Sequence, residues 1–343
     1  MPMTRWLARF PEVWITASIV AITLAFALSQ GLPFSLPSGE RAAFVGIHYL
    51  YPLIGLCIWI AVAAVGQREK LGSTLFIGLP CYAIVLVCHF NLKLWIPHIN
   101  PALWDDFFWA TDEAIRPLID FCIALSHAIA PVISLDGNFY MTAFILLFYA
   151  GFCYHAVKTP ERFHTLFLAA LILQGLGGLA YLAMPAIGPF LYEQGPYTLA
   201  TAAQQSMYAA WQANVAGGAG WLDTYGGTHI TVGLAAMPSL HAGGSFLFLL
   251  FAFRYAKPLA YPAALVFAYI CMAAVATRWH YAIDIPVGMA LALFSYWAAH
   301  RLSAPGSVAT IDEQPALAAP APRSLFARFV RRQPPAIRQI SNL

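Results

Sequence analysis

The sequence predicts an all-α, polytopic integral membrane protein with about eight transmembrane helices packed as a bundle. Two properties of the composition indicate this class: 60% of the 343 residues are hydrophobic and only 10% are charged, whereas soluble domains carry about 25% charged residues. A third indication is that uncharged stretches recur along the chain, most of them near the roughly 20 residues that a helix needs to cross a bilayer. Together these observations exclude a cytosolic globule, a disordered protein and a collagen-like fibre.

Eight uncharged stretches define the predicted spans. The last has only 16 residues and needs the Arg301 side chain to reach the lipid headgroups. A ninth uncharged stretch, 194–222, is rich in Gly, Gln, Asn and Thr, and we expect it to be a loop. The eight spans are expected within 13–39, 42–67, 71–92, 137–157, 163–192, 224–253, 258–277 and 285–300.

The distribution of Lys and Arg predicts the orientation of these spans. With a cytoplasmic N-terminus, 14 of the 18 cations fall in cytoplasmic segments, as the positive-inside rule requires. The outer face then carries Arg41, Lys93, Arg116 and Arg278. We therefore expect a multi-pass protein of the bacterial inner membrane, with both termini cytoplasmic and its functional site on the periplasmic or extracellular side. The first apolar run also resembles a secretory signal, but an uncleaved first helix fits the charge pattern better.

The chain divides into parts of different composition. The predicted parts are N-terminal transmembrane helices (1–97), an outer interfacial segment (98–136), a membrane core (137–302) containing a long outer loop (185–237), and a disordered basic cytoplasmic tail (303–343). The interfacial segment mixes acidic and aromatic residues, which is typical of a helix in the headgroup zone. Its Asp105, Asp106 and Asp112 are expected to face solvent or headgroups. The net charge of +3 comes mostly from the tail and indicates no nucleic-acid partner.

The first segment that carries chemistry is Met-Pro-Ser-Leu-His-Ala-Gly-Gly at 237–244, directly before a short run of strongly apolar residues. Proline fits the first turn of a helix, and Ser239 is a natural N-cap. The free backbone N–H groups at such a helix start bind anions, while Gly243 and Gly244 let a ligand or a neighbouring helix come close. His241 would then stand beside any phosphate bound there.

The second segment, 277–284, lies between the last two predicted spans. His280 and Asp284 are four residues apart, so on a helix they share one face and the carboxylate can accept the imidazole N–H. Pro286 is a complication, because residues before a proline avoid the α region and the helix then starts after His280. A bond between the two would fix the tautomer and leave the other ring nitrogen free as a nucleophile or base.

The spacing of the two segments brings their histidines together. The 39 positions from His241 to His280 allow one crossing, a turn and a return, each limb spanning roughly 25–30 Å. Both histidines, Asp284 and Arg278 would then meet in one pocket, and ionisable groups at membrane depth indicate function. One histidine can attack phosphorus while the other protonates the departing alkoxide, and Arg278 can carry charge on the phosphate oxygens. This chemistry needs neither a metal nor a cofactor.

These segments resemble signature motifs of the PAP2 (type 2 phosphatidic acid phosphatase) superfamily. Pro-Ser-Leu-His-Ala-Gly from 238 and His-Tyr-Ala-Ile-Asp-Ile-Pro-Val-Gly from 280 look like its second and third motifs. Met-Pro-Ala-Ile-Gly-Pro at 184–189 is most similar to the inositol phosphorylceramide synthase-like branch. The likeness covers roughly 140–300 and implies a PAP2-type helical bundle as the catalytic core.

The resemblance also implies roles for individual residues. Two departures from the family pattern concern the phosphate clamp. The first motif, a lysine followed by Arg-Pro, is absent: Arg116-Pro117 has its ending, but Trp109 stands in place of the lysine and the segment lies too early in the chain. In the third motif, Ala274 stands where the family has its arginine. Arg278 is then the first candidate for the clamp, followed by Arg116 and Lys93. The remaining implied roles are His280 as nucleophile, Asp284 as its orienting partner, His241 as general acid, and Ser239 and Leu240 as phosphate-binding residues.

The branch implies transfer of a phospho-headgroup to a lipid hydroxyl at the outer membrane face, through a phosphohistidine. The partners would be a phospholipid or lipid phosphate donor and a sphingolipid-like acceptor. The wider superfamily implies hydrolysis instead, as in a lipid phosphate or pyrophosphate phosphatase. Two weaker alternatives are a metal-dependent hydrolase that uses His241, His280 and Asp284 as ligands, and a transporter, although the chain shows no internal repeat.

Overall fold

The structure is a computed structural model that describes residues 10–40, 69–133, 135, 139–231 and 237–303, with a few isolated positions between 42 and 58. The predicted span 42–67 falls almost wholly outside the described residues, as do Arg41 and the predicted tail from 304 onward. The described residues form helices and turns, with no strand among them. This confirms the all-α prediction.

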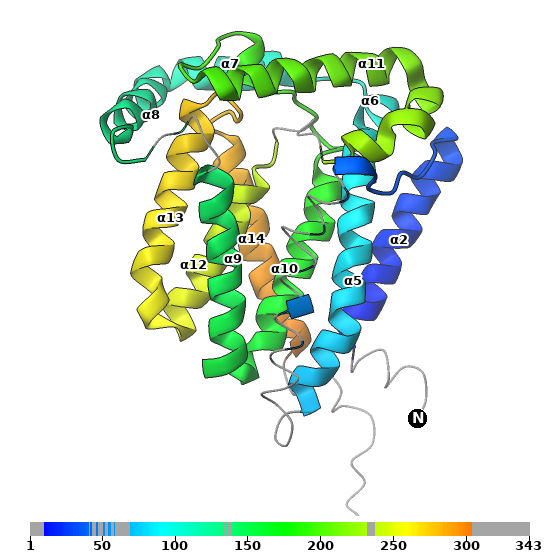
Figure 1. The fold of residues 1–343 in the computed structure, drawn as a ribbon, viewed down its shortest axis with the longest axis vertical. Helices are drawn as coiled ribbons and strands as arrows, with labels where there is room; N and C mark the ends of the chain where they lie inside the picture. Colours follow the sequence, from blue (N-terminus) through cyan, green and yellow to red (C-terminus); the bar gives the residue numbers. More distant parts are fainter. Residues whose placement is uncertain are drawn as a thin grey trace, which may run out of the picture.

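Seven of the described helices run side by side as a bundle (Figure 1). They are α2 (Pro11–Gln30), α5 (Glu69–Leu94), α9 (Phe139–Lys158), α10 (Pro160–Ala180), α12 (Leu240–Tyr255), α13 (Lys257–Ala276) and α14 (Asp284–Ser303). Among them, α2, α5, α9, α10 and α13 are long and apolar enough to cross a membrane, and α12 is a shorter apolar helix. The polytopic membrane class is therefore confirmed, while the count of eight spans stays a prediction.

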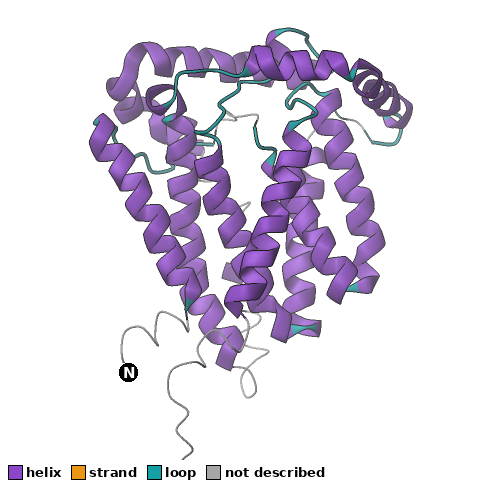
Figure 2. Ribbon diagram, turned by 180° about the vertical axis from the view of Figure 1, so that it is seen from behind, coloured by secondary structure: helices purple, strands orange, loops and turns teal. Residues whose placement is uncertain are grey.

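One end of the bundle, here called the capped end, is covered by helices that lie across it (Figures 1 and 2). They are α7 (Asp105–Ala114), α8 (Arg116–Ile129) and α11 (Thr198–His229). The short α6 (Ile96–Ile99) leads into α7, and the 3-10 turn η2 (Pro189–Leu191) precedes α11. The predicted interfacial segment is thus helical, with a break between α7 and α8 at Ile115.

The prediction that 194–222 is a loop is wrong, because these residues lie mostly within the long helix α11. The first half of α11 is rich in Ala and Gln, which are good helix formers. The glycines that suggested a loop interrupt the helix only at Gly218, where a φ of 56° produces a kink. The centre of the predicted outer loop 185–237 is therefore a helix that covers the bundle.

The centre of the bundle is α10, which packs against α5, α9, α12 and α14. Its side chains at Leu166, Leu168 and Leu171 are fully buried. In a membrane such contacts stabilise through close van der Waals packing, because lipid tails are as apolar as the side chains themselves. This packing brings the N-terminal ends of α12 and α14 together at the capped end, where both predicted motifs lie.

Candidate active site

The start of α12 carries the first motif. Ser239 is the N-cap, as predicted, and its hydroxyl oxygen accepts a backbone N–H of the first turn at 3.4 Å. Leu240 opens the helix and His241 follows it. The His241 imidazole stands edge-on to two rings of α9, with its centroid 5.4 Å from that of Tyr140 and 4.8 Å from that of Phe144. These rings limit the orientations that the imidazole can adopt.

His280 lies in the connection between α13 and α14, and Asp284 is the first residue of α14. The His280 Nδ1 is 3.2 Å from Oδ2 of Asp284, so the pair forms although the two residues do not share a helix. Pro286, in the first turn of α14, accounts for the late helix start. The buried Asp284 carboxylate also accepts the Tyr281 N–H at 2.9 Å. Because Nδ1 meets the carboxylate, Nε2 is the ring nitrogen left to meet a substrate.

The two motifs are joined directly. The Ser239 backbone N–H donates to the Asp284 carbonyl at 3.1 Å. Glycines let α12 and α14 touch: a Cβ built on Gly243 would lie 2.6 Å from the Gly288 carbonyl oxygen, and one on Gly288 would clash with the Ser239 carbonyl oxygen. His241 is close enough to His280 to interact with it electrostatically. The hairpin of α12 and α13 therefore returns the chain to the same end of the bundle.

We expect Gly288→Ala to lower the free energy of unfolding by about 1–3 kcal/mol, because the new methyl group would push α14 away from the Ser239 carbonyl. Thermal unfolding of the purified protein in detergent measures this effect. Gly72→Ala in α5 is the matched control, since a Cβ there meets no atom within 4 Å, and it should leave the melting temperature unchanged or higher. An unchanged melting temperature in Gly288→Ala would contradict the close helix contact.

Lys93 reaches the same region from the last turn of α5. Its ammonium group lies 5.2 Å from the centroid of the Tyr181 ring and interacts electrostatically with His241. One turn earlier on α5, His89 is buried, and its Nδ1 lies 3.0 Å from the Gln174 carbonyl oxygen. Within the part of the chain that the structure describes, no carboxylate forms an ion pair with Lys93. Lys93 is thus a cation without a counter-charge near a candidate catalytic histidine.

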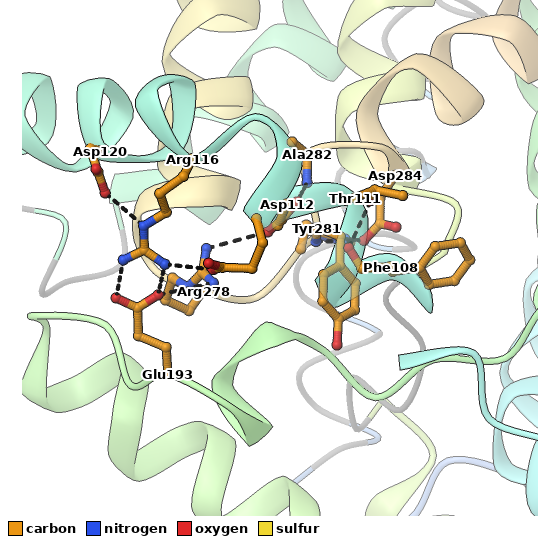
Figure 3. A network of polar contacts seen from close by, with 12 residues as sticks. Phe108, Thr111, Asp112, Arg116, Asp120, Glu193, Arg278, Tyr281, Ala282 and Asp284 are labelled. Atoms are coloured by element: carbon orange, nitrogen blue, oxygen red, sulfur yellow. Dashed lines mark hydrogen bonds and ion pairs between the residues drawn. The ribbon is translucent and has the colours of Figure 1, made fainter. Parts of the chain in front are cut away.

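Arg278 and Arg116, by contrast, pair with carboxylates (Figure 3). The buried Arg278 guanidinium meets Asp112 at 3.4 Å and Glu193 at 3.3 Å, and it lies over the Trp109 ring. Arg116 donates to both Glu193 oxygens, at 2.8 and 2.6 Å, and these bonds hold the pKa of Glu193 below its ordinary value. Both arginines tie α7 and α8 to the turn after η2, and a phosphate contact for either stays a prediction.

Two aspartates of α7 are buried, which corrects the expectation that they face solvent or headgroups. Asp105 is 4% exposed and Asp112 1%, whereas Asp106 is exposed. Desolvation raises the pKa of both buried carboxyls above the ordinary value. Their spacing of seven residues, about two helical turns, is the sequence signal that puts both on one face of α7.

Asp105 joins two segments that lie far apart in the sequence. Its carboxylate accepts the backbone N–H groups of Ile187 and Gly188 at 2.9 Å each, and the Tyr281 hydroxyl at 2.8 Å. Phe108, Ala186, Met237 and Tyr281 form one apolar cluster beside it. The segment 184–189 is therefore packed against the connection that carries His280.

The fold and the site define a polytopic helical membrane protein with a histidine–aspartate pair and a second histidine at the capped end of its bundle. The family model of the PAP2 superfamily matches residues 124–298, a range that contains His241, His280 and Asp284. The chain therefore belongs to the PAP2 superfamily, whose members are generally phosphatases or phosphotransferases. No curated protein and no solved structure matches the chain. The inositol phosphorylceramide synthase-like branch stays a prediction.

Proposed function

We propose that this protein transfers a phospho-headgroup between membrane lipids through a phosphohistidine on His280, without a metal. The observation that carries the proposal is the His280–Asp284 pair beside His241 and Lys93 at the capped end, within the region that the family model matches. We further propose that the capped end lies at the outer face of a bacterial inner membrane, with both termini cytoplasmic, since most cations then lie inside.

The geometry supports a division of labour among these side chains. Nε2 of His280 attacks phosphorus, so that a P–N bond forms while the P–O bond to the leaving alkoxide breaks. His241 gives its proton to that alkoxide and takes one from the acceptor hydroxyl in the second step, in which the acceptor oxygen displaces His280. Asp284 accepts the Nδ1–H of His280 and stabilises the positive charge that the ring gains during the attack.

Lys93 is the cation that we propose for the phosphate oxygens. It lies near His241 without an ion-pair partner among the described residues, whereas the Arg278 and Arg116 guanidinium groups are already held by carboxylates. The free N–H groups at the start of α12, in Leu240 and His241, add donors for an anion. Ser239 acts here as the cap that orients this helix start.

The covering helix α11 supports transfer rather than hydrolysis. Gln204 donates to the Thr277 carbonyl at 2.8 Å, beside the His280 connection, and Asn214 donates to the Leu94 carbonyl at 2.8 Å, beside Lys93. Both amide side chains are buried, so α11 is fastened over the site on two sides. Excluding water would protect a phosphohistidine until a lipid hydroxyl arrives. A lipid phosphatase is the second candidate, because other members of the superfamily hydrolyse.

The test uses the purified protein in detergent with EDTA and radiolabelled phospholipids and lipid pyrophosphates, with and without ceramide or diacylglycerol. Free phosphate and new lipid products are followed together. A new phospholipid that appears only with an acceptor is the expected result. Phosphate release alone would make the protein a phosphatase, and turnover that appears only when a metal is supplied would contradict the metal-independent mechanism.

A further inference from the structure

We infer that Asp112 is a positioning residue, which fixes the connection that carries His280 and so sets where the nucleophile stands. The inference rests on the proposed function. Oδ1 of Asp112 accepts the Ala282 N–H at 2.9 Å, and Oδ2 meets the Arg278 guanidinium at 3.4 Å. Figure 3 shows Asp112 reaching from α7 toward both residues. One side chain thus holds the chain two positions before and two positions after His280.

The connection needs such support because its backbone bends sharply. α13 ends at Ala276, and Arg278 takes a φ of 60°, a left-handed conformation that is costly for residues other than glycine. The His280 N–H then turns back to the Ala274 carbonyl at 3.1 Å. A backbone of this kind persists only where the surrounding structure fixes it, and the Asp112 ion pair fixes the side chain of Arg278, where the bend occurs.

A second carboxylate of α7 holds the same connection. The Tyr281 hydroxyl donates to Asp105 at 2.8 Å, while the Tyr281 backbone N–H donates to Asp284. Tyr281 and Ala282 are therefore held by carboxylates from α7 on one side and from α14 on the other. The His280 imidazole bonds Asp284 and not Asp112, so the direct contacts of Asp112 reach His280 through the backbone. The Asp112 charge also acts electrostatically on Asp284, and a variant that removes this charge but keeps the hydrogen-bond acceptor separates the two effects.

Two replacements of Asp112 distinguish an effect on the position of His280, measured by kcat, from an effect on the stability of the fold, measured by the melting temperature. Asp112→Asn keeps an oxygen that can accept the Ala282 N–H but loses the charge opposite Arg278, and Asp112→Ala loses both. Both variants should therefore melt at a lower temperature than the wild type. We expect Asp112→Ala to lower kcat about 10- to 100-fold with KM within about threefold, and Asp112→Asn to recover most of that loss.

The control on the same helix is Asp106→Asn, at an exposed position. Because asparagine keeps an oxygen that can accept the Tyr192 hydroxyl, as Asp106 does, this variant should match the wild type in both kcat and melting temperature. Equal kcat per folded molecule in Asp112→Ala and wild type would overturn the inference. So would equal losses of kcat in the alanine and asparagine variants, since turnover would then follow stability alone. If Asp112→Ala does not fold, Asp112→Glu keeps the charge but displaces the acceptor by a methylene, and a wild-type kcat there would also overturn it. A wild type without EDTA-resistant turnover rejects the proposed function instead.

Discussion

Replacing His280 with alanine is expected to lower phosphoester turnover at least about 1,000-fold, because it removes the nitrogen that we propose forms the covalent intermediate. His241→Ala should lower turnover about 100- to 10,000-fold, since the alkoxide would leave without a proton donor. The melting temperatures should stay near that of the wild type. The His280 ring is 12% exposed, and without it Asp284 still accepts the Tyr281 N–H. Assays in detergent with EDTA measure the turnover.

Trapping the covalent intermediate tests directly whether His280 carries the phosphate. With radiolabelled substrate, wild-type protein quenched in alkali should carry an acid-labile phosphate on His280, and the His280→Ala variant should carry none. His127→Ala is the matched control, because His127 is exposed on α8 at the capped end. Wild-type turnover in His280→Ala, or an equal label in that variant, would refute the mechanism.

Lys93→Met is expected to impair catalysis, whereas Arg278→Met is expected to destabilise the fold. Lys93→Met should lower kcat/KM about 100- to 1,000-fold while the protein stays folded, because a phosphate would lose its cation. Arg278→Met should instead lower the free energy of unfolding by about 3–5 kcal/mol, since it leaves the buried Asp112 without a counter-charge. Thermal unfolding and steady-state kinetics of both variants distinguish the two effects.

The conservative replacements provide the controls for this contrast. Lys93→Arg keeps a cation and should retain part of kcat/KM, whereas Arg278→Lys keeps the charge but loses the planar group that meets two carboxylates. Two results together would make Arg278, and not Lys93, the cation that binds the phosphate. Lys93→Met would bind and turn over substrate like the wild type, and Arg278→Met would melt like the wild type but show no turnover.

The parts of the site that depend on local spacing were predictable from the sequence. The interval between His241 and His280 matches one helical hairpin, and the four-residue step from His280 to Asp284 brings imidazole and carboxylate together even outside a helix. Ser239 was predicted as a cap because its chemistry acts on its own first turn. Each of these features needs only residues within or beside one element.

The parts that depend on tertiary packing were not predictable. Asp112 and Arg278 are 166 residues apart in the sequence. No local sequence pattern predicts that the Arg278 guanidinium pairs with a carboxylate of α7 instead of remaining free to bind a phosphate. The helix α11 was missed for another reason. Its glycines and polar residues are typical of a loop, whereas its buried Gln204 and Asn214 fasten it to distant backbone carbonyls that the sequence does not reveal.

The contact between Gly243 and Gly288 has an electrical consequence. It brings the N-terminal ends of α12 and α14 to one point, and each helix start carries roughly half a positive elementary charge from its aligned peptide dipoles. At α14 this partial charge falls on Asp284, the first residue of the helix, and offsets part of the cost of burying that carboxylate. At α12 the same partial charge faces the region of His241 and attracts an anion. Two helix ends can thus supply part of the positive potential that Arg278, bound to its carboxylates, does not provide.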